Sequence, residues 1–196
     1  MEKGWDVFDV EPKFLSPAKG HVLISEPFLR DINFARTVVF LVEHGKDGSV
    51  GIILNRLSSL HVNDVVREFR YLGDIPLYSG GPVSTDTLFY LHVLPGVEGS
   101  LPMGDGVYLN GDFAAIKRYV LQGNPLDGKI RFFIGCSGWD SGQLQQEIDE
   151  HVWLISRIGR AQVMDASGDD LWKMALAGLG QGYARWTLFP EDPSLN

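Results

Sequence analysis

Runs of apolar residues divide the chain into short strands. Residues 20–25, 37–42 and 50–54 are rich in Val, Ile and Leu, and residues 37–42 are apolar at consecutive positions, which predicts a strand buried on both faces. Between the second and third runs, His44–Ser49 has the Gly, Asp and Ser residues of a turn, so the two runs are predicted to form a central β-hairpin. Further strands are predicted at 77–79, 88–94, 107–109, 130–134 and 152–156.

Apolar residues at helical spacing predict four helices. Val62, Val65, Val66 and Phe69 repeat at i, i+3, i+4 and i+7, which is typical of one face of a helix over 62–70. The remaining helices are predicted at 112–122, from about Asp140 to His151, and near 171–179, where Ser167 and Asp170 have the spacing of a capping box.

These elements predict an α+β (α/β) fold, because hairpins alternate with strand–helix–strand units. We expect a single compact domain over 20–190 with a mixed, mainly antiparallel sheet, helices packed on it and one shared core. Residues 1–19 are expected to form an N-terminal arm, and 191–196 a C-terminal tail. The apolar residues of the arm either fold back on the domain, which is the favoured interpretation, or dock on a partner. Residues 95–106 contain four glycines and two prolines and are predicted to form a long loop.

Composition narrows the functional classes. The chain has 196 residues, of which 44% are hydrophobic, enough for a sizeable core. The net charge of −8 makes nucleic acid an improbable partner, because phosphate binding needs clustered Lys and Arg. The single cysteine excludes an internal disulfide. No apolar run approaches the roughly 20 residues of a membrane span, and the acidic N-terminus is unlike a signal peptide, so we expect a cytoplasmic protein.

The most distinctive segment is glycine-rich and runs over 135–144. It is predicted to join a buried strand to a helix, where free N–H groups form an anion cradle and Cys136 becomes a stabilised thiolate. A structural interpretation competes with this one and is favoured: Asp140 caps the helix, Gln143 completes a capping box, and Trp139 and Leu144 form a hydrophobic staple. The segment lacks the glycine of a nucleophile elbow and the lysine of a phosphate-binding loop.

Other candidate binding residues stand at the ends of predicted strands, where proteins often place sites. They are Arg36, the pair Asn55-Arg56, and Gly80-Gly81 before a proline, each of which also has a structural interpretation as a turn or strand end. Glu147 and His151 are four residues apart and could share a metal, although an exposed helix face is the favoured interpretation. We therefore predict no metal and no cofactor.

Several of these segments, in this order, resemble the AlgH/YqgE family of bacterial proteins. The matching pieces are Gly20–Ile24, Phe34–Val39 with Glu43-His44, Gly51–Arg56, Gly80–Val83, and Gly138-Trp139 with Gly142–Leu144 and Glu147-Ile148. The resemblance covers roughly residues 17–156. It implies one domain with a bifurcated mixed sheet that curls toward a pseudo-barrel and is flanked by helices. The resemblance implies no activity. The family is associated with transcriptional control, but this association does not come with a recognisable DNA-binding module.

Three hypotheses follow for the function. The first is a non-enzymatic binding or regulatory domain that holds an unknown protein or a small anion. Its binding surface would be formed by Arg36, Asn55, Arg56, Gly80, Gly81, Gly138, Trp139 and Gly142. The second is an enzyme of unknown class that uses Cys136 or Ser137 as nucleophile. The third is a transcriptional regulator, which the net charge disfavours.

Overall fold

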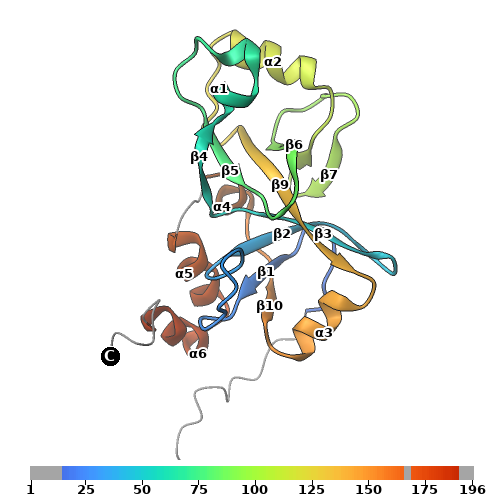
Figure 1. Cartoon of the computed structure of the whole chain (residues 1–196), viewed down its shortest axis with the longest axis vertical. Helices are drawn as coiled ribbons and strands as arrows, with labels where there is room; N and C mark the ends of the chain where they lie inside the picture. The colour runs from blue at the N-terminus through green and yellow to red at the C-terminus, as the bar shows by residue number, and fades with distance from the viewer. Residues whose placement is uncertain (1–14, 166–168, 190–196) are drawn as a thin grey trace, which may run out of the picture.

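The computed structural model describes residues 15–165 and 169–189 and forms one domain around a ten-stranded sheet (Figure 1). The main path through the sheet is β10-β1-β2-β3-β9-β6-β8-β7, and β4 and β5 lie beside it. Every strand pair is antiparallel except β5 with β9. The predicted mixed, mainly antiparallel α+β fold is confirmed, and the sheet is not closed into a barrel.

The strands are β1 Val22–Ser25, β2 Val38–Gly45, β3 Gly48–Ile53, β4 Leu57–His61, β5 Pro76–Ser79, β6 Val83–His92, β7 Leu101–Gly104, β8 Val107–Leu109, β9 Ile130–Asp140 and β10 Trp153–Ser156. The helices are α1 Val62–Val65, α2 Phe113–Leu121, α3 Gln143–Asp149, α4 Arg160–Asp165, α5 Asp169–Gly178 and α6 Gln181–Ala184, with 3₁₀ turns at Arg67–Phe69 and Arg185–Leu188. Among the described residues, no helix is long and apolar enough to cross a bilayer.

The sheet is bifurcated at β9. The first half of β9 lies between β5 and β6, with Phe132 opposite Leu77 in the parallel pair. In its second half β9 pairs with β3, where Gly138 lies opposite Val50. Gly80 occupies the branch point, because its N–H donates to the Ile134 carbonyl at 2.8 Å and its carbonyl accepts from Ile53 N–H at 2.9 Å.

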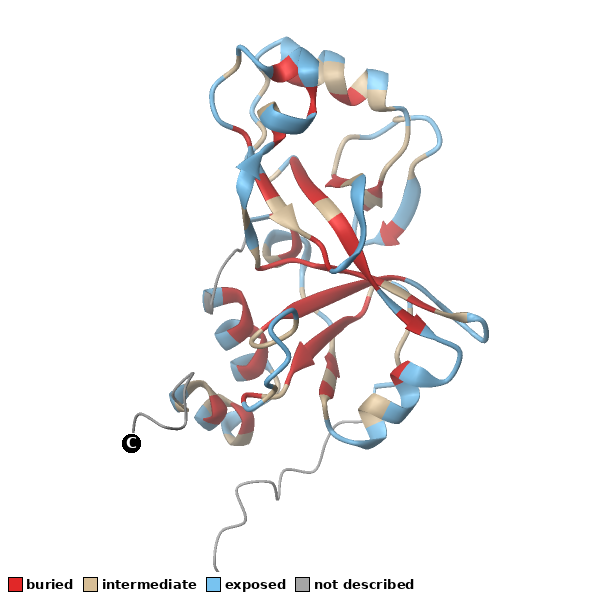
Figure 2. Ribbon diagram, viewed as in Figure 1, coloured by how far each residue is buried: buried red, intermediate tan, exposed pale blue. Residues whose placement is uncertain are grey.

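Buried apolar side chains form three clusters rather than the single expected core. Figure 2 shows the buried residues along the strands of the sheet and on the helices packed against it. Because successive strand residues face opposite ways, Val38 and Phe40 of β2 pack toward α5, while Val39 and Leu41 pack toward α3. This confirms the prediction that both faces of this strand are buried. The third cluster packs α1 and α2 against the first half of β9, whose Phe132 belongs to it.

Two predictions about elements were wrong in extent. The expected helix over 62–70 ends after one turn, because the Asn63 side chain binds the backbone of the following loop instead: its Nδ2 donates to the Phe69 carbonyl and its Oδ1 accepts from Ile75 N–H, both at 2.8 Å. The expected loop over 95–106 contains strand β7, which turns into β8 at Asp105-Gly106, a dipeptide typical of tight hairpins.

The glycine-rich segment also differs from its prediction. It continues as strand to Asp140, and α3 begins at Gln143 with Gly142 as its N-cap. Asp140 is therefore not the cap, although its N–H donates to Gln143 Oε1 at 2.9 Å, which is one half of the expected capping box. Helices α4 and α6 were not predicted, and Ser167 and the N-terminal arm up to residue 14 lie outside the described residues.

Candidate functional site

Arg36, Asn55 and Arg56 lie together, but their polar groups hold the fold. Asn55 is 8% exposed, accepts from Val38 N–H at 2.8 Å and donates to the Arg36 carbonyl at 2.8 Å. The Arg56 guanidinium donates to the carbonyl of Ile32 at 2.6 Å. Together these bonds join the end of β3 to the loop before β2, so this part of the predicted surface has a structural explanation.

Arg36 connects the same loop to the C-terminal helices. Its Nη2 donates to the Phe189 carbonyl at 2.6 Å, and its guanidinium carbon lies 5.0 Å from the centre of the Trp172 ring. The Trp172 indole in turn donates to the Ser25 carbonyl at 2.9 Å. The Arg36 guanidinium therefore contacts the Phe189 carbonyl and the face of the Trp172 ring. Together with the bond from Trp172 to Ser25, these contacts hold α5 against the sheet.

Gly80 and Gly81 are needed where two strands of the sheet approach closely. A Cβ atom on Gly80 would collide with the carbonyl oxygen of Gly135 in β9, and one on Gly81 with the carbonyl of Cys136. Gly81 also has φ of +148°, which L side chains rarely adopt. The two glycines therefore allow β9 to branch.

We expect Gly80→Ala to destabilise the protein by about 1–3 kcal/mol or more, because the added methyl group meets backbone that cannot move aside. Gly73→Ala is the matched control, since nothing lies within 4 Å of its added Cβ. Urea unfolding of both variants measures the difference. Equal midpoints would contradict the close approach at the branch point.

Trp139 and Gly138 belong to the second half of β9, and Gly142 follows this strand as the N-cap of α3. Trp139 is 5% exposed and packs edge-on against Trp153, with 6.0 Å between ring centroids. Glu147 Oε2 accepts from both indole N–H groups, at 2.8 Å from Trp139 and 2.7 Å from Trp153. Gly138 pairs with β3, and Gly142 adopts φ of +77° before α3. Trp139 is thus a core residue, and Glu147 is occupied by two indoles.

Cys136 and Ser137 have the surroundings of structural residues. Cys136 is 7% exposed, and burial raises the pKa of its thiol, although a hydrogen bond with Ser84 opposes this shift. The Ser137 hydroxyl is fully buried and donates to the Gly80 carbonyl at 3.2 Å. A raised pKa lowers the fraction of reactive thiolate at neutral pH, which does not favour a nucleophile.

Cys136 should accordingly react with Ellman's reagent at least about tenfold more slowly than glutathione does at pH 8, since both burial and a raised pKa suppress the thiolate. In urea, where the chain unfolds, the rate should rise to that of a free thiol. A native rate equal to that of glutathione would contradict a buried sulfur and revive the enzyme hypothesis.

Arg131 was not singled out from the sequence. It lies in β9, is 5% exposed, and donates to the carbonyls of Val163 at 2.7 Å and Leu54 at 2.5 Å. Its guanidinium carbon lies 4.1 Å from the Tyr78 ring centre. Burial lowers the pKa of Arg131, and Tyr78 and Asp165 oppose this shift. Its position as a single arginine in an apolar strand could have indicated this role from the sequence, because arginine is almost never buried without a partner. We call Arg131 with its two carbonyl acceptors the buried clamp.

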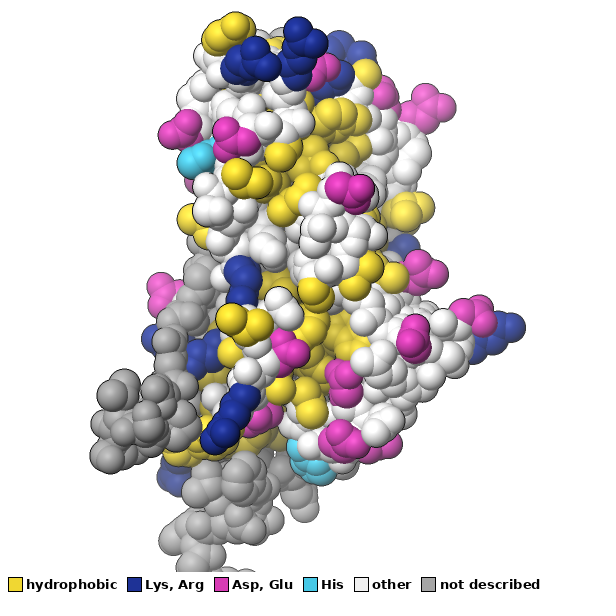
Figure 3. Space-filling view, viewed as in Figure 1, with side chains coloured by type: hydrophobic (Ala, Val, Ile, Leu, Met, Phe, Trp, Pro, Cys, Tyr) yellow, Lys and Arg dark blue, Asp and Glu magenta, His cyan; other side chains and the backbone are white. Residues whose placement is uncertain are grey.

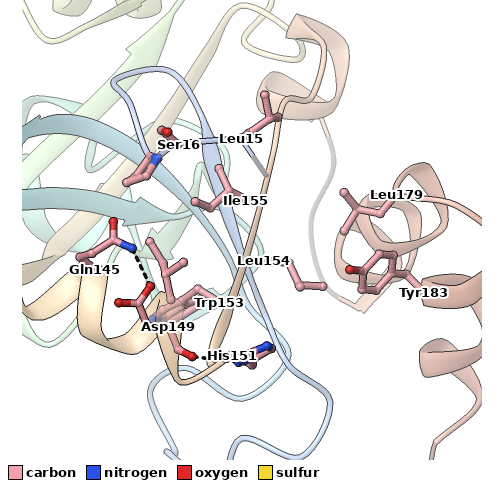
Figure 4. Close-up of a pocket in the computed structure, with 12 residues that line it drawn as sticks. Leu15, Ser16, Gln145, Asp149, His151, Trp153, Leu154, Ile155, Leu179 and Tyr183 are labelled. Carbon is pink, nitrogen blue, oxygen red and sulfur yellow. Dashed lines mark hydrogen bonds between the residues drawn. The ribbon is translucent and has the colours of Figure 1, made fainter. Parts of the chain in front are cut away.

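An apolar cleft of about 360 Å³ follows the edge of the sheet at β10 (Figure 4). Its lining comes from the chain before β1, from α3 and the turn after it, from β10, and from α5–α6. The residues are Leu15, Ser16, Pro17, Gln145, Ile148, Asp149, His151, Trp153, Leu154, Ile155, Leu179 and Tyr183. None of the eight residues of the predicted binding surface lines it.

Among the described residues, the outer edge of β10 has no pairing strand. Glu26 N–H donates to the Val152 carbonyl, and the antiparallel register places Leu154 opposite Ile24. The Val152 carbonyl and the backbone groups of Leu154 therefore face β1, while the Val152 N–H donates to the Glu147 carbonyl at 2.9 Å. The alternate residues Trp153 and Ile155 direct their backbone groups outward. The cleft thus combines an apolar lining with free strand-edge hydrogen-bonding groups.

Charges are distributed unevenly over the face seen in Figure 3, where basic side chains gather over α1 and α2 and acidic ones lie around β3 and α3. Carboxylates accompany two of the cations on α2: Lys117 lies 2.6 Å from Glu68, and Arg118 lies 3.7 Å from Asp112. Within the described residues no group of three or more His, Cys, Asp or Glu could hold a metal ion.

The fold and the cleft define a one-domain α+β protein with a branched sheet and a free sheet edge. A family model described as AlgH-like (DUF179) matches residues 22–184, and the chain belongs to this family. A UPF0301 protein of Bacteroides fragilis is 52% identical over 196 residues and the full length of both chains. A second, from Bacteroides thetaiotaomicron, is 49% identical over 97% of each.

Two solved structures are similar to this one. The solution structure of the AlgH protein from Pseudomonas aeruginosa has a TM-score of 0.70 and 30% identity, covering 91% of this chain and 98% of that one. A crystal structure of a protein from Corynebacterium diphtheriae has a TM-score of 0.75 at 24% identity, covering 92% and 95%, and supports the fold alone. These comparisons establish the family, and the names of these relatives state no reaction and no ligand.

Proposed function

We propose that this chain is a non-enzymatic binding domain that takes up an extended apolar segment of a partner protein along β10. The observation that carries the proposal is the coincidence of the cleft with the unpaired edge of the sheet. A segment added as a further strand gains main-chain hydrogen bonds from the edge and places alternate side chains in the cleft. Such an edge is otherwise a liability, which proteins usually cover.

The cleft lining indicates the chemistry of the partner segment. Among the described residues that line the cleft, Asp149 is the only acidic side chain and none is Lys or Arg. Burial raises the pKa of Tyr183, so that hydroxyl stays protonated and able to donate; it points toward the cleft in Figure 4. An apolar segment with one basic residue complements this lining. Residues 1–14 of the N-terminal arm contain four acidic residues, Glu2, Asp6, Asp9 and Glu11, against the two lysines Lys3 and Lys13, so their net negative charge complements this lining less well.

The other two hypotheses have less support. A Cys136 or Ser137 nucleophile would have to act from a buried position with a raised thiol pKa or an occupied hydroxyl. A DNA-binding role would need a basic face, whereas the chain carries a net charge of −8. We expect no sequence-dependent duplex binding at physiological salt, and an electrophoretic shift at sub-micromolar protein would contradict this.

The test selects a random twelve-residue peptide library on the full chain and measures the selected peptides by NMR. We expect alternating apolar peptides with a basic residue, and we expect their binding to slow hydrogen exchange at the Trp153 and Ile155 amides. Leu179→Glu, which places a charge in the cleft, should weaken binding about tenfold or more. Leu121→Glu, on an exposed position of α2, is the matched control and should bind normally.

Two outcomes would overturn the proposal. One is that the selected peptides perturb residues away from β10, or that none is selected. The other concerns the arm: in the full chain the Trp153 and Ile155 amides would already be protected, and removal of residues 1–14 would expose them. That result would assign the cleft to the chain's own N-terminus.

A further inference from the structure

A second hollow, of about 320 Å³, lies further along the segment that leads into β1 and shares no lining residue with the cleft. Four apolar side chains line it, from Phe40, Met103, Val107 and Val163, which all belong to the cluster between the sheet and α4–α5. The rest of its lining is polar and comes from the chain before β1, the end of β10, the start of α4 and the β7–β8 turn. These residues are Lys19, Gly20, His21, Gly104, Asp105, Arg157 and Arg160.

The charges on this lining are mostly positive. Lys19, Arg157 and Arg160 contribute three cations, and Asp105 is the one carboxylate among the described residues that line the hollow. Asp105 is held in place because its Oδ2 accepts from the backbone N–H of Arg160 at 2.9 Å. In a chain with a net charge of −8, such a concentration of cations makes a local anion-attracting site.

His21 orients one of these cations. Its Nδ1 lies 3.0 Å from the Ser16 carbonyl, which can only accept, so Nδ1 carries the proton. Its Nε2 is then free to accept from Arg157 Nε at 2.9 Å. His21 thus holds Arg157 through Nε, which leaves both Nη groups to donate side by side to an anion, the geometry that suits phosphate.

From this arrangement we infer that the basic hollow, formed by Lys19, His21, Arg157 and Arg160 over an apolar floor, binds a phosphate group. Its volume is within the range of small-molecule sites, and Phe40, Met103, Val107 and Val163 give it an apolar floor that an organic substituent could contact. The ligand class is a phosphate monoester of a small organic molecule, with free phosphate as the other source of the same chemistry. The site is separate from the β10 cleft, so this inference does not rest on the proposed function.

The experiment titrates the full chain with phenyl phosphate, inorganic phosphate and phenol, and follows amide shifts by NMR. We expect phenyl phosphate to shift residues around Lys19–His21 and Arg157–Arg160 and to bind more tightly than inorganic phosphate. Equal affinity would assign the site to free phosphate. Phenol binding as tightly as phenyl phosphate would overturn the inference, as would no binding of either phosphate probe at 10 mM, the order of a weak site.

Matched variants separate a specific site from a general effect of charge. Arg157→Gln should weaken phenyl phosphate binding about tenfold or more, the equivalent of one charge-assisted hydrogen bond. Arg30→Gln removes the same charge from an exposed loop outside the hollow and should leave binding unchanged. Asp105→Asn, which retains an acceptor for Arg160 N–H, should tighten binding. Equal losses in Arg157→Gln and Arg30→Gln would overturn the inference.

Discussion

Replacing Trp139 by alanine should lower the free energy of unfolding by about 3–5 kcal/mol. The indole is 5% exposed and fills the cluster between the sheet and α3, where it contacts Trp153 and Phe34. Its removal leaves a cavity and takes away one of the two indole donors of Glu147. Urea unfolding followed by far-ultraviolet circular dichroism measures the loss, since the fluorescence of the variant would itself change.

Asp140→Ala is the control for this experiment, one residue further along β9. Asp140 is exposed and does not cap α3, so its replacement should change stability by no more than about 0.5 kcal/mol. A loss near 1 kcal/mol would indicate that Asp140 caps the helix in solution. A Trp139→Ala protein as stable as the wild type would show that the indole is not a core residue, and would return it to the candidate binding surface.

Arg131→Ala should destabilise the protein by several kcal/mol. The guanidinium donates to the carbonyls of Leu54 and Val163, and each buried carbonyl left without a donor costs about 1–3 kcal/mol. The truncated stem also leaves a void beside Tyr78 and Phe133, whose rings the guanidinium covers. Because Val163 lies in α4, we expect amide hydrogen exchange in α4 to accelerate more than in α2.

Two variants make the Arg131 prediction specific. Arg131→Lys keeps a charge, but a single ammonium group cannot span two carbonyls, so it should lose part of the stability. Arg118→Ala removes an exposed arginine, whose ion pair with Asp112 is worth little, and should be close to neutral. If Arg131→Ala and Arg118→Ala unfold at the same urea concentration, the buried clamp does not contribute to stability.

The sequence determined the elements whose signal is local. The β2–β3 hairpin, strands β5, β8 and β10, and helix α2 follow from apolar periodicity and turn residues within a few positions. The burial of β2 on both faces was also readable, because its apolar residues are consecutive. The Asp105-Gly106 hairpin has a local turn signal of the same kind, but β7 is short and its Pro102 and the surrounding glycines are typical of a loop.

Only the tertiary structure decided what the distinctive residues do. The glycines at 80, 81 and 135 looked like turn or cradle residues, yet they serve a crossing between strands more than 50 positions apart, which no local pattern encodes. Asn55 and Arg56 looked like a binding pair, and their partners lie in a loop some 20 residues earlier. The β10 cleft and the basic hollow likewise depend on which segments become neighbours, because a free sheet edge and a cluster of cations are properties of pairing and packing rather than of sequence spacing.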